Sequence, residues 1–308
     1  MKKDLTSITD LNKDEILELL KEASRLKAEI KRHGILPLAR GKMGVLVFEK
    51  PSLRTRVTFE RALQQLGAAS SYLSPSDIGL GTRETVPDVA RNLSRWVDCI
   101  IARVFEHEKI TELAKNATIP VINALSDLEH PCQILADLLT IVDDRGSLDG
   151  VTVAWTGDGN NVCHSLMLAA GIVGFKLNVA TPRGFEPAPE IMEKSNKFAE
   201  ASSAVIKLTY DPCQAVADAD YLYTDVWASM GQENEAEQRR QIFRPYQVNR
   251  QLLNRTKPNI KVMHCLPAHR GEEITDDVLD GPQSVVLNQA ENRLHIQRAI
   301  LARLLKNG

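Results

Sequence analysis

Short apolar runs alternate with segments of helical period along almost the whole chain, which is the pattern of an α/β fold with parallel sheets. We expect strands in the first half near 43–48, 70–74, 99–103 and 119–123, with helices near 12–33, 53–67, 86–96 and 107–116. In the second half we expect strands near 151–156, 176–180, 203–208, 220–224, 260–264 and 284–288, with helices near 161–173, 188–200, 211–218 and 234–244.

A long amphipathic segment, 131–144, separates the two alternations and is closed by a polar stretch that ends in Gly146. The chain has 308 residues, more than a single hydrophobic core usually serves. The fold class we predict is therefore α/β with two domains, each a mainly parallel sheet flanked by helices. The first domain is expected over 1–144 and the second over 145–290, with a C-terminal helix, 291–308, packing back on the first.

Composition and charge narrow the class of protein. Apolar residues make up 43% of the chain and charged residues 25%, and the net charge of −2 leaves no basic surface for nucleic acid or a membrane. The five cysteines are an odd number without framework spacing, so we expect free thiols in a reducing compartment. Neither a signal peptide nor an apolar run of about 18 residues is visible, and we expect a cytoplasmic protein.

The stretch from Phe48 to Arg56 joins a predicted strand to a predicted helix. Pro51 cannot continue a strand ladder, and Ser52 is a favoured N-cap residue. Free backbone N–H groups, two hydroxyls and two guanidinium groups then meet at one helix N-terminus, which suits a phosphate. The alternative is a capped helix with exposed arginines.

Two further motifs lie where predicted strands end. His130-Pro131-Cys132-Gln133 opens the long helix, with proline in its first turn and an imidazole and an amide able to bind a small polar ligand. A merely capping His130 is the alternative. His264-Cys265-Leu266-Pro267 follows the strand near 260–264, at the end of a parallel strand where ligands bind. Its thiol could be a polar contact, a nucleophile or a metal ligand, although the spacing supports a metal site or a Cys–His protease weakly.

The second half offers two more candidate binding segments. Gly157-Asp158-Gly159-Asn160-Asn161 resembles the start of a dinucleotide fingerprint, but a third glycine and a closing acidic residue are missing. The short Asn side chains could equally bind a ligand carboxylate. Residues 225–237 contain four carboxylates and no lysine or arginine, so this loop is either a solvated acidic segment or the acceptor of a cationic ligand.

Taken together, these motifs resemble the aspartate/ornithine transcarbamylase family, and within it the ornithine carbamoyltransferases. The resemblance covers nearly the whole chain and rests on five motifs in order: Ser52-Leu53-Arg54-Thr55-Arg56, His130-Pro131-Cys132-Gln133, Asp225 with Ser229-Met230-Gly231, His264-Cys265-Leu266-Pro267, and Arg293. The first two are shared across the family and imply carbamoyl phosphate. Asp225 with its following motif, and the His-Cys-Leu-Pro motif, point to ornithine.

By this resemblance, carbamoyl phosphate would be bound by Ser52, Leu53, Arg54, Thr55, Arg103, His130, Pro131, Cys132, Gln133, Cys265, Leu266 and Arg293. Ornithine would be bound by Asn161, Asp225, Ser229 and Met230. Catalysis would fall to Arg54, Arg103, His130 and Cys265, with Cys265 as a hypothetical general base. No metal and no cofactor is implied, and the family implies a homotrimer with active sites between subunits.

The implied reaction is transfer of the carbamoyl group to the side-chain amine of L-ornithine, giving L-citrulline and phosphate, in arginine biosynthesis. The direction of metabolic flux and assembly beyond the trimer stay open. Two residues depart from the family pattern: Leu53 replaces a threonine, and Gly79 replaces a glutamine that reaches a neighbour's phosphate, a contact that Thr82 or Arg83 could supply. Enzymes for putrescine or acetylornithine, an NAD-dependent oxidoreductase and a non-catalytic paralogue are the alternatives, while an aspartate enzyme would need cations in 225–237.

Overall fold

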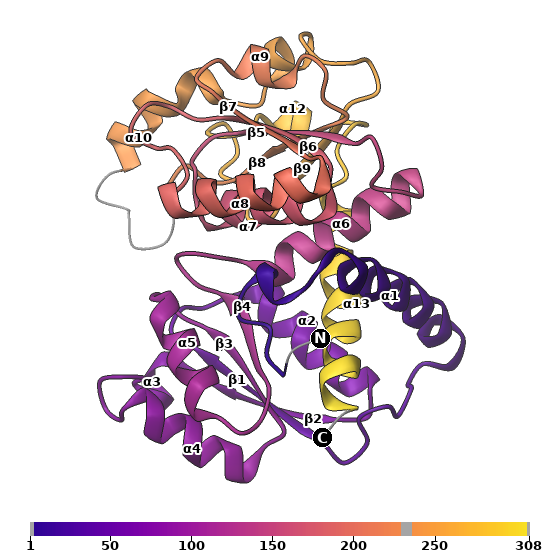
Figure 1. The fold of residues 1–308 in the computed structure, drawn as a ribbon, viewed down its shortest axis with the longest axis vertical. Helices are drawn as coiled ribbons and strands as arrows, with labels where there is room; N and C mark the ends of the chain where they lie inside the picture. The colour runs from indigo at the N-terminus through magenta and orange to yellow at the C-terminus, as the bar shows by residue number, and fades with distance from the viewer. Residues whose placement is uncertain (1–2, 229–235, 307–308) are drawn as a thin grey trace. The chain divides into compact units, whose positions relative to one another are not determined.

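The structure is a computed structural model that describes residues 3–228 and 236–306. The chain divides into two compact units, which we call unit 1 (Met1–Asp143 with Glu291–Gly308) and unit 2 (Asp144–Ala290). Each unit contains a parallel sheet flanked by helices, so the predicted fold class is confirmed (Figure 1). No helix within the described ranges is both long and apolar enough to cross a membrane.

Unit 1 is built on a four-stranded parallel sheet with the order β2-β1-β3-β4. Its strands are β1 (Met43–Phe48), β2 (Ala69–Leu73), β3 (Cys99–Arg103) and β4 (Val121–Leu125). The helices are η1 (Ile8–Asp10), α1 (Lys13–His33), α2 (Leu53–Gln65), α3 (Pro75–Ile78), α4 (Val86–Trp96), α5 (His107–Asn116) and α6 (Pro131–Arg145), which continues to the unit boundary. Helix α13 (Val286–Leu305) returns the chain to this unit.

The two faces of this sheet are covered by different helices. Alternate strand residues such as Val45, Ile100 and Val121 pack against α3, α4 and α5 in one apolar cluster. On β1, packing requires a glycine at position 44, because a Cβ on Gly44 would lie 2.7 Å from a methyl carbon of Leu63 in α2. Helix α2 can therefore approach β1 closely, which places its N-terminus just beyond the strand end.

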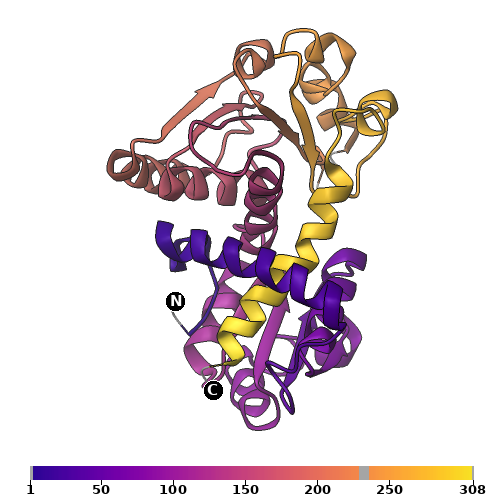
Figure 2. The same cartoon turned by 90° about the vertical axis from the view of Figure 1, so that its right-hand side faces the viewer.

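Helix α1 shows how local sequence sets an element's limits. Asn12 and Glu15 form a capping box at its start, and Gly34, with φ of 78°, follows its last residue. Its buried residues recur with helical period: Ile16, Leu19, Leu20, Ala23, Leu26 and Ile30. Helix α1 crosses α13 (Figure 2), and Arg303 of α13 forms an ion pair with Glu18.

Unit 2 is built on a five-stranded parallel sheet with the order β7-β6-β5-β8-β9. The strands are β5 (Thr152–Thr156), β6 (Lys176–Ala180), β7 (Val205–Thr209), β8 (Tyr221–Thr224) and β9 (Lys261–His264). Helices α7 (Asn161–Val173) and α8 (Pro189–Ser202) lie side by side on one face (Figure 1). An apolar cluster on the other face joins the sheet to α9 (Pro212–Val216), α11 (Arg250–Leu253) and α12 (Asp276–Leu279). The remaining elements are α10 (Ala236–Phe243) and η3 (Arg244–Tyr246).

The expected strand at 284–288 is wrong. Ser284 makes only an isolated bridge with Val262, and α13 begins at Val286. Val286 joins the apolar cluster under β9, whereas the next residue, Leu287, is 76% exposed. The side chain of Gln289 meanwhile accepts a hydrogen bond from His264 N at 2.9 Å. These contacts favour an early helix start over a sixth strand.

Candidate active site

Strand order decides where a ligand can bind in unit 1. Strands β1 and β3 are neighbours, and the connections that follow them lead to opposite sides of the sheet, to β2 and β4. The last residues of the pair, Phe48 and Arg103, are in register. Ligands of open α/β sheets bind at such a switch point, beyond the carboxyl ends of the strands. The predicted anion-binding stretch and Arg103 therefore both lie at this point.

The stretch after β1 forms the N-terminus of α2, as predicted. Ser52 is the N-cap, and its side chain accepts a hydrogen bond from Thr55 N at 3.3 Å. Thr55 is buried, Arg54 is half-buried and Leu53 is 75% exposed. The exposed Leu53 side chain does not fill the core, which agrees with a role for its backbone N–H.

A buried polar network connects three helices next to this N-terminus. Arg293 of α13 donates to Gln133 Oε1 at 2.6 Å and to Thr55 Oγ1 at 3.1 Å. Gln133 Nε2 in turn donates to Asp137 Oδ1 at 2.7 Å. All four side chains are buried. Arg293 and Asp137 thus hold opposite ends of the Gln133 amide, and this fixes which end is the acceptor.

Asp137 is not among the site residues predicted from the sequence. The available signal was its spacing, since residues four apart on a helix are neighbours. What the sequence did not reveal is that α6 buries both residues, so that the pair is shielded from water.

His130 is a buried imidazole surrounded by cations. Burial lowers its pKa well below the usual value, and the positive charges of Arg293, Arg103 and Lys50 lower it further. His130 is therefore neutral at physiological pH and can donate a hydrogen bond without adding another positive charge. Arg103, which is predicted to bind the same ligand as His130, supplies one of these positive charges.

Lys50 is a second residue that sequence analysis did not assign to the site. Its ammonium nitrogen lies 4.6 Å from the centroid of the Phe105 ring. Burial, followed by the charge of Arg103, lowers its pKa to about 8. Lys50 therefore adds a cation to the group formed by Arg103 and Arg293, and an anion bound there would favour its charged form.

Pro131 and Cys132 complete the second motif. Pro131 is the first residue of α6, as predicted from its tolerance in a first turn. The Cys132 thiol donates to the carbonyl of Asn123 in β4 at 3.4 Å, and burial raises its pKa to about 12. This thiol is an inert packing group, so a contact between Cys132 and a ligand would use its backbone.

The residues directly before Gly79, 75–78, form the short helix α3. Gly79 ends this helix with a φ of +49°, and a Cβ there would lie 2.9 Å from Arg83 Cβ. A larger residue at this position would be strained, which explains why glycine is accepted here. The predicted contact of this loop with a neighbouring site stays a prediction.

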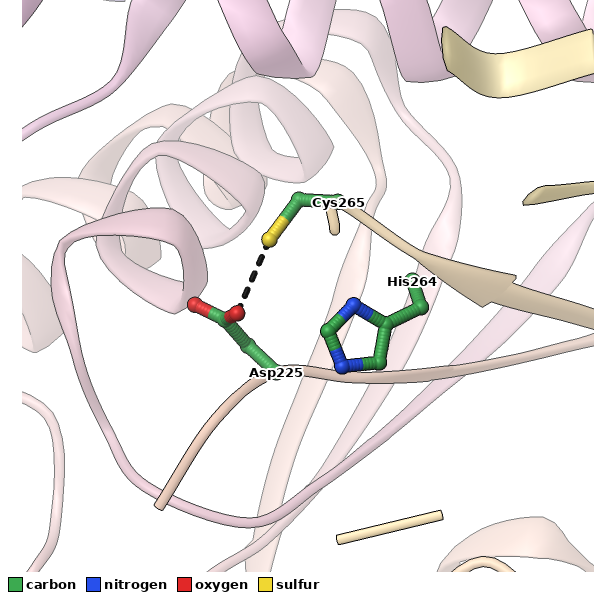
Figure 3. Close-up of side chains that lie close together, drawn as sticks. All are labelled: Asp225, His264 and Cys265. Atoms are coloured by element: carbon green, nitrogen blue, oxygen red, sulfur yellow. Dashed lines mark hydrogen bonds between the residues drawn. The ribbon is translucent and has the colours of Figure 1, made fainter. Parts of the chain in front are cut away.

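In unit 2, the switch point lies between β5 and β8, since β6 and β9 continue the sheet on opposite sides. Asp225 follows β8 directly and is 7% exposed. Its Oδ2 accepts a hydrogen bond from Asn160 Nδ2 at 2.8 Å, and its Oδ1 accepts one from the Cys265 thiol at 2.9 Å (Figure 3). Sequence analysis chose Asn161 for this site, and the structure adds Asn160. Asn161 is the half-buried first residue of α7.

Gly159, which directly precedes Asn160, is required by chain packing. A Cβ on Gly159 would lie 2.3 Å from Pro187 N and 2.7 Å from Phe185 O. Only glycine lets the 185–187 backbone pass at this distance. The resemblance to a dinucleotide fingerprint is thus explained by chain packing, and this argues against the NAD-dependent alternative.

The turn after β9 is held by a buried His–Glu pair. His264 Nε2 lies 3.0 Å from Glu273 Oε1, and Leu266 N donates to His264 Nδ1 at 2.8 Å. Because Nδ1 accepts, Nε2 must carry the proton that points to Glu273. Leu266 has a φ of 58°, an unusual value for a branched residue, and its N–H bond to His264 supports that conformation.

The ligand atoms of Asp225, His264 and Cys265 lie within 4.8 Å of one another (Figure 3). A metal ion there would need a carboxylate oxygen of Asp225 and a ring nitrogen of His264, and all of these atoms already have hydrogen-bond partners. A second group, His269, Glu272 and Glu273, shares Glu273 with the same pair. In that second group, Glu272 accepts a hydrogen bond from Arg240 at 2.9 Å and Glu273 accepts one from His269 N at 2.6 Å.

Four predicted site residues remain to be placed. Cys265 and Leu266, predicted to contact carbamoyl phosphate, belong to unit 2. Ser229 and Met230, predicted to bind ornithine, lie outside the described residues. Among the described residues of unit 2, Arg239 donates to the carbonyl of Trp227 at 2.8 Å and pairs with Asp158, whose pKa burial raises to about 6.

The fold and these groups define a two-unit α/β enzyme with a cationic ligand site in one unit and a carboxylate site in the other. Residues 3–143 match the family described as the aspartate/ornithine carbamoyltransferase carbamoyl-P binding domain. Residues 149–304 match the Asp/Orn binding domain of the same family. The chain belongs to the aspartate/ornithine carbamoyltransferase family, whose members are carbamoyl-group transferases.

Individual relatives agree with this assignment. The ornithine carbamoyltransferase of Pyrococcus abyssi is 52% identical over 303 residues, covering 98% of this chain and 96% of the relative. A relative from Pyrococcus furiosus named as the anabolic ornithine carbamoyltransferase is 52% identical over 97% of this chain and 95% of its own length. The solved structure of the Pyrococcus furiosus enzyme superposes with a TM-score of 0.93 at 51% identity, covering 97% of this chain and 96% of that one.

Proposed function

We propose that this chain transfers the carbamoyl group of carbamoyl phosphate to the side-chain amine of L-ornithine, giving L-citrulline and phosphate. The observation that carries the proposal is the buried, neutral His130 among Arg103, Arg293 and Lys50 beside the N-terminus of α2. Such a group fits an anion that also has a carbonyl oxygen to be polarised. The names of relatives at 52% identity support ornithine as the second substrate.

In unit 1, the phosphate would be bound by the α2 N-terminus with Ser52, Leu53, Arg54 and Thr55, and by Arg103. The carbamoyl oxygen would accept hydrogen bonds from His130, Arg103 and Thr55. Gln133 would meet the carbamoyl amide through Oε1, the end that the Asp137 and Arg293 contacts turn into the acceptor. No metal or cofactor is required by this scheme.

The chemistry is an addition followed by an elimination. The neutral amine of ornithine attacks the carbamoyl carbon, the C=O electrons move onto oxygen, and a tetrahedral oxyanion forms. The oxyanion then re-forms the carbonyl as the C–O bond to phosphate breaks, and the amine nitrogen passes its proton to a base, the role for which Cys265 is the candidate. Fixed donors aimed at the developing oxyanion supply the main stabilisation, because they require little reorganisation during the reaction.

The attacking amine must first lose its own proton. With a lysine-like pKa near ~10.4, only about one molecule in 10³ is neutral near pH 7.4, a free-energy cost of roughly 4 kcal/mol. A carboxylate next to this amine would increase that cost, whereas desolvation and nearby cations would reduce it. Asp225 is therefore assigned to the α-amino group of ornithine, and Asn161, Ser229 and Met230 to the rest of its backbone end.

Cys265 as the general base stays a hypothesis. Its thiol donates to Asp225 in this structure, so proton acceptance by sulfur would first require that bond to change. The Cys265→Ala variant should lose a titration from its pH–rate profile if the hypothesis is right. An unchanged profile would refute it.

The acceptor is tested by offering the purified protein carbamoyl phosphate with ornithine, putrescine, acetylornithine or aspartate in parallel. The proposal predicts that ornithine gives the highest kcat/KM, because Asp225 binds a free α-amino group that acetylornithine lacks. Preference for putrescine or acetylornithine would identify a sibling enzyme. Transfer to aspartate, or to none of the four amines, would overturn the proposal.

A homotrimer is proposed as the working assembly. Leu53 is 75% exposed and Val57 53% exposed, one turn apart on α2, and Phe105 is 44% exposed. Apolar side chains in such positions suit a contact with a second copy. Light scattering during size exclusion should give three times the 34.2 kDa chain mass, or a multiple of it. A monomer would contradict this assignment.

We also place the enzyme in arginine biosynthesis and in the cytoplasm. The first proposal is supported by the anabolic name of the Pyrococcus furiosus relative. The second is supported by the cysteines, all five of which carry free thiols. Complementation of an arginine-requiring strain that lacks this activity tests the first, and cell fractionation tests the second.

A further inference from the structure

Asn160 occupies the turn between β5 and α7, and both ends of its amide are engaged. Its Oδ1 accepts hydrogen bonds from Val162 N at 3.0 Å and from Cys163 N at 3.1 Å, so the residue is the N-cap of α7. Its Nδ2 donates to Asp225 Oδ2 at 2.8 Å. One side chain therefore joins a helix cap to the carboxylate of the proposed ornithine site.

The cap determines which end of the amide faces Asp225. Two backbone N–H groups require an acceptor, and only Oδ1 can serve both. Rotating the amide by 180° would place its NH₂ group against two donors and its oxygen against a carboxylate. Both changes are unfavourable, so Asn160 presents a donor to Asp225 in a fixed direction.

Asp225 is held from two sides by this arrangement. The amide comes from the turn after β5, and the Cys265 thiol comes from the residue after β9. Because β5, β8 and β9 are adjacent strands, the three residues meet at one edge of the sheet. The two donors bind different carboxylate oxygens, which fixes both the position and the plane of the carboxylate (Figure 3 shows the thiol side).

We propose that Asn160 is a positioning residue that orients Asp225 toward the α-amino group of the amino-acid substrate, and that it thereby contributes to selection for ornithine. The inference rests on the proposed function, which assigns the α-amino group to Asp225. Asn160 acts through Asp225 and not on the reacting carbon. Its loss should therefore weaken ornithine binding and leave carbamoyl phosphate binding in place.

Two substitutions remove the amide donor of Asn160 but keep a side-chain oxygen that can cap α7. Asn160→Ser keeps a side-chain oxygen for the helix N-terminus but removes the amide donor. Asn160→Asp keeps the cap and sets a second carboxylate against Asp225. The matched control is Asn249→Ser, because Asn249 caps α11 of the same unit by accepting from Leu252 N at 3.0 Å.

The KM of each substrate and the inhibition constant of L-norvaline are measured for every variant. L-norvaline has the backbone groups of ornithine without the side-chain amine. Because the lost hydrogen bond is to a charged group, Asn160→Ser should raise the ornithine KM and the norvaline constant about tenfold or more. Asn160→Asp should raise both further, while the carbamoyl phosphate KM changes less than about twofold in either variant.

A double-mutant cycle with Asp225→Asn shows whether Asn160 acts through Asp225. The inference predicts that Asn160→Ser has little further effect on norvaline binding in the Asp225→Asn background. An equal effect of Asn160→Ser on norvaline binding in both backgrounds would overturn the inference. A loss of affinity for both substrates that Asn249→Ser also shows would overturn it as well. Failure of the proposed function is distinguishable, because the unaltered protein would then form no citrulline from ornithine.

Discussion

At the scale of single residues, burial among cations gives His130 its chemical role. An imidazole in water is partly protonated near neutral pH, but burial together with Arg293, Arg103 and Lys50 lowers the pKa of His130 and keeps it neutral. The N–H group of a neutral imidazole can donate a hydrogen bond to the carbamoyl oxygen as negative charge develops there. The nearby arginines provide fixed positive charge for the phosphate.

Replacing His130 should therefore reduce turnover more than binding. We expect His130→Asn to lower kcat by about 10²–10³, the typical effect of losing one oxyanion donor. The KM for carbamoyl phosphate should change little, since the arginines remain. Steady-state kinetics at saturating ornithine measures both constants, and a kcat within a factor of three of the unaltered enzyme would contradict the role.

Lys50 should give carbamoyl phosphate binding a pH dependence. Its pKa is lowered to about 8 by burial and by Arg103, so Lys50 is charged below pH 8 and progressively neutral above it. The KM for carbamoyl phosphate should therefore rise between pH 7 and pH 9 at saturating ornithine. Lys50→Arg keeps its charge throughout this range and should flatten the rise.

The matched control for Lys50 is Lys197→Arg, because Lys197 lies on the exposed face of α8 with Glu193 as its partner. This variant should retain the pH dependence of the unaltered enzyme. A KM that is constant with pH in the unaltered enzyme, or one that rises equally in Lys50→Arg, would show that Lys50 does not act on the anion.

At the scale of elements, α6 and α13 orient the Gln133 amide through the side chains of Asp137 and Arg293. Asp137→Leu would leave the Gln133 amide donor buried without its acceptor, which typically costs about 1–3 kcal/mol. We expect a corresponding loss in the free energy of unfolding and a higher KM for carbamoyl phosphate. Asp137→Asn keeps an acceptor oxygen and should cost less on both measures.

Chemical denaturation and steady-state kinetics on the two Asp137 variants provide the comparison. Equal losses in Asp137→Leu and Asp137→Asn would mean that the negative charge matters and that the hydrogen bond to Gln133 does not. An unchanged KM in Asp137→Leu would show that orientation of Gln133 is unimportant for binding.

The turn between β5 and α7 depends on Gly159. Gly159→Ala would place a Cβ 2.3 Å from Pro187 N, so backbone must move, and overpacking of this kind costs about 1–3 kcal/mol or more. Gly184→Ala is the control, since its Cβ would meet nothing within 4 Å although φ is +85°. Denaturant midpoints should fall further for Gly159→Ala, and a smaller fall than for Gly184→Ala would contradict this packing.

Much of the element structure could be predicted from the chain because its patterns are local. The apolar run 43–48 and the helix 161–173 were predicted to the residue. Short helices such as α3 and α12 were not, because four residues carry too little periodicity. The strand expected at 284–288 is wrong, because α13 begins at Val286 and its burial there depends on tertiary contacts with β9 that the sequence does not show.

At the scale of the whole molecule, both sites lie at switch points of parallel sheets, which is where the order of strands brings distant segments together. The motifs revealed the residues at the strand ends but not which ends are neighbours. The contacts of Asn160 with Asp225 and of Asp137 with Gln133 could not be predicted for this reason, because strand order creates the first and burial of α6 the second. Residue types predict candidate chemistry, whereas topology determines the partners.

Carbamoyl transfer to ornithine can be tested by following both products of a single reaction. The protein is supplied with ¹³C-labelled carbamoyl phosphate and L-ornithine, and phosphate and labelled citrulline are measured together. Carbamoyl transfer to ornithine should give one labelled citrulline for each phosphate released in excess of uncatalysed breakdown. Enzyme-dependent phosphate release without labelled citrulline, or no acceleration over the uncatalysed reaction, would contradict it.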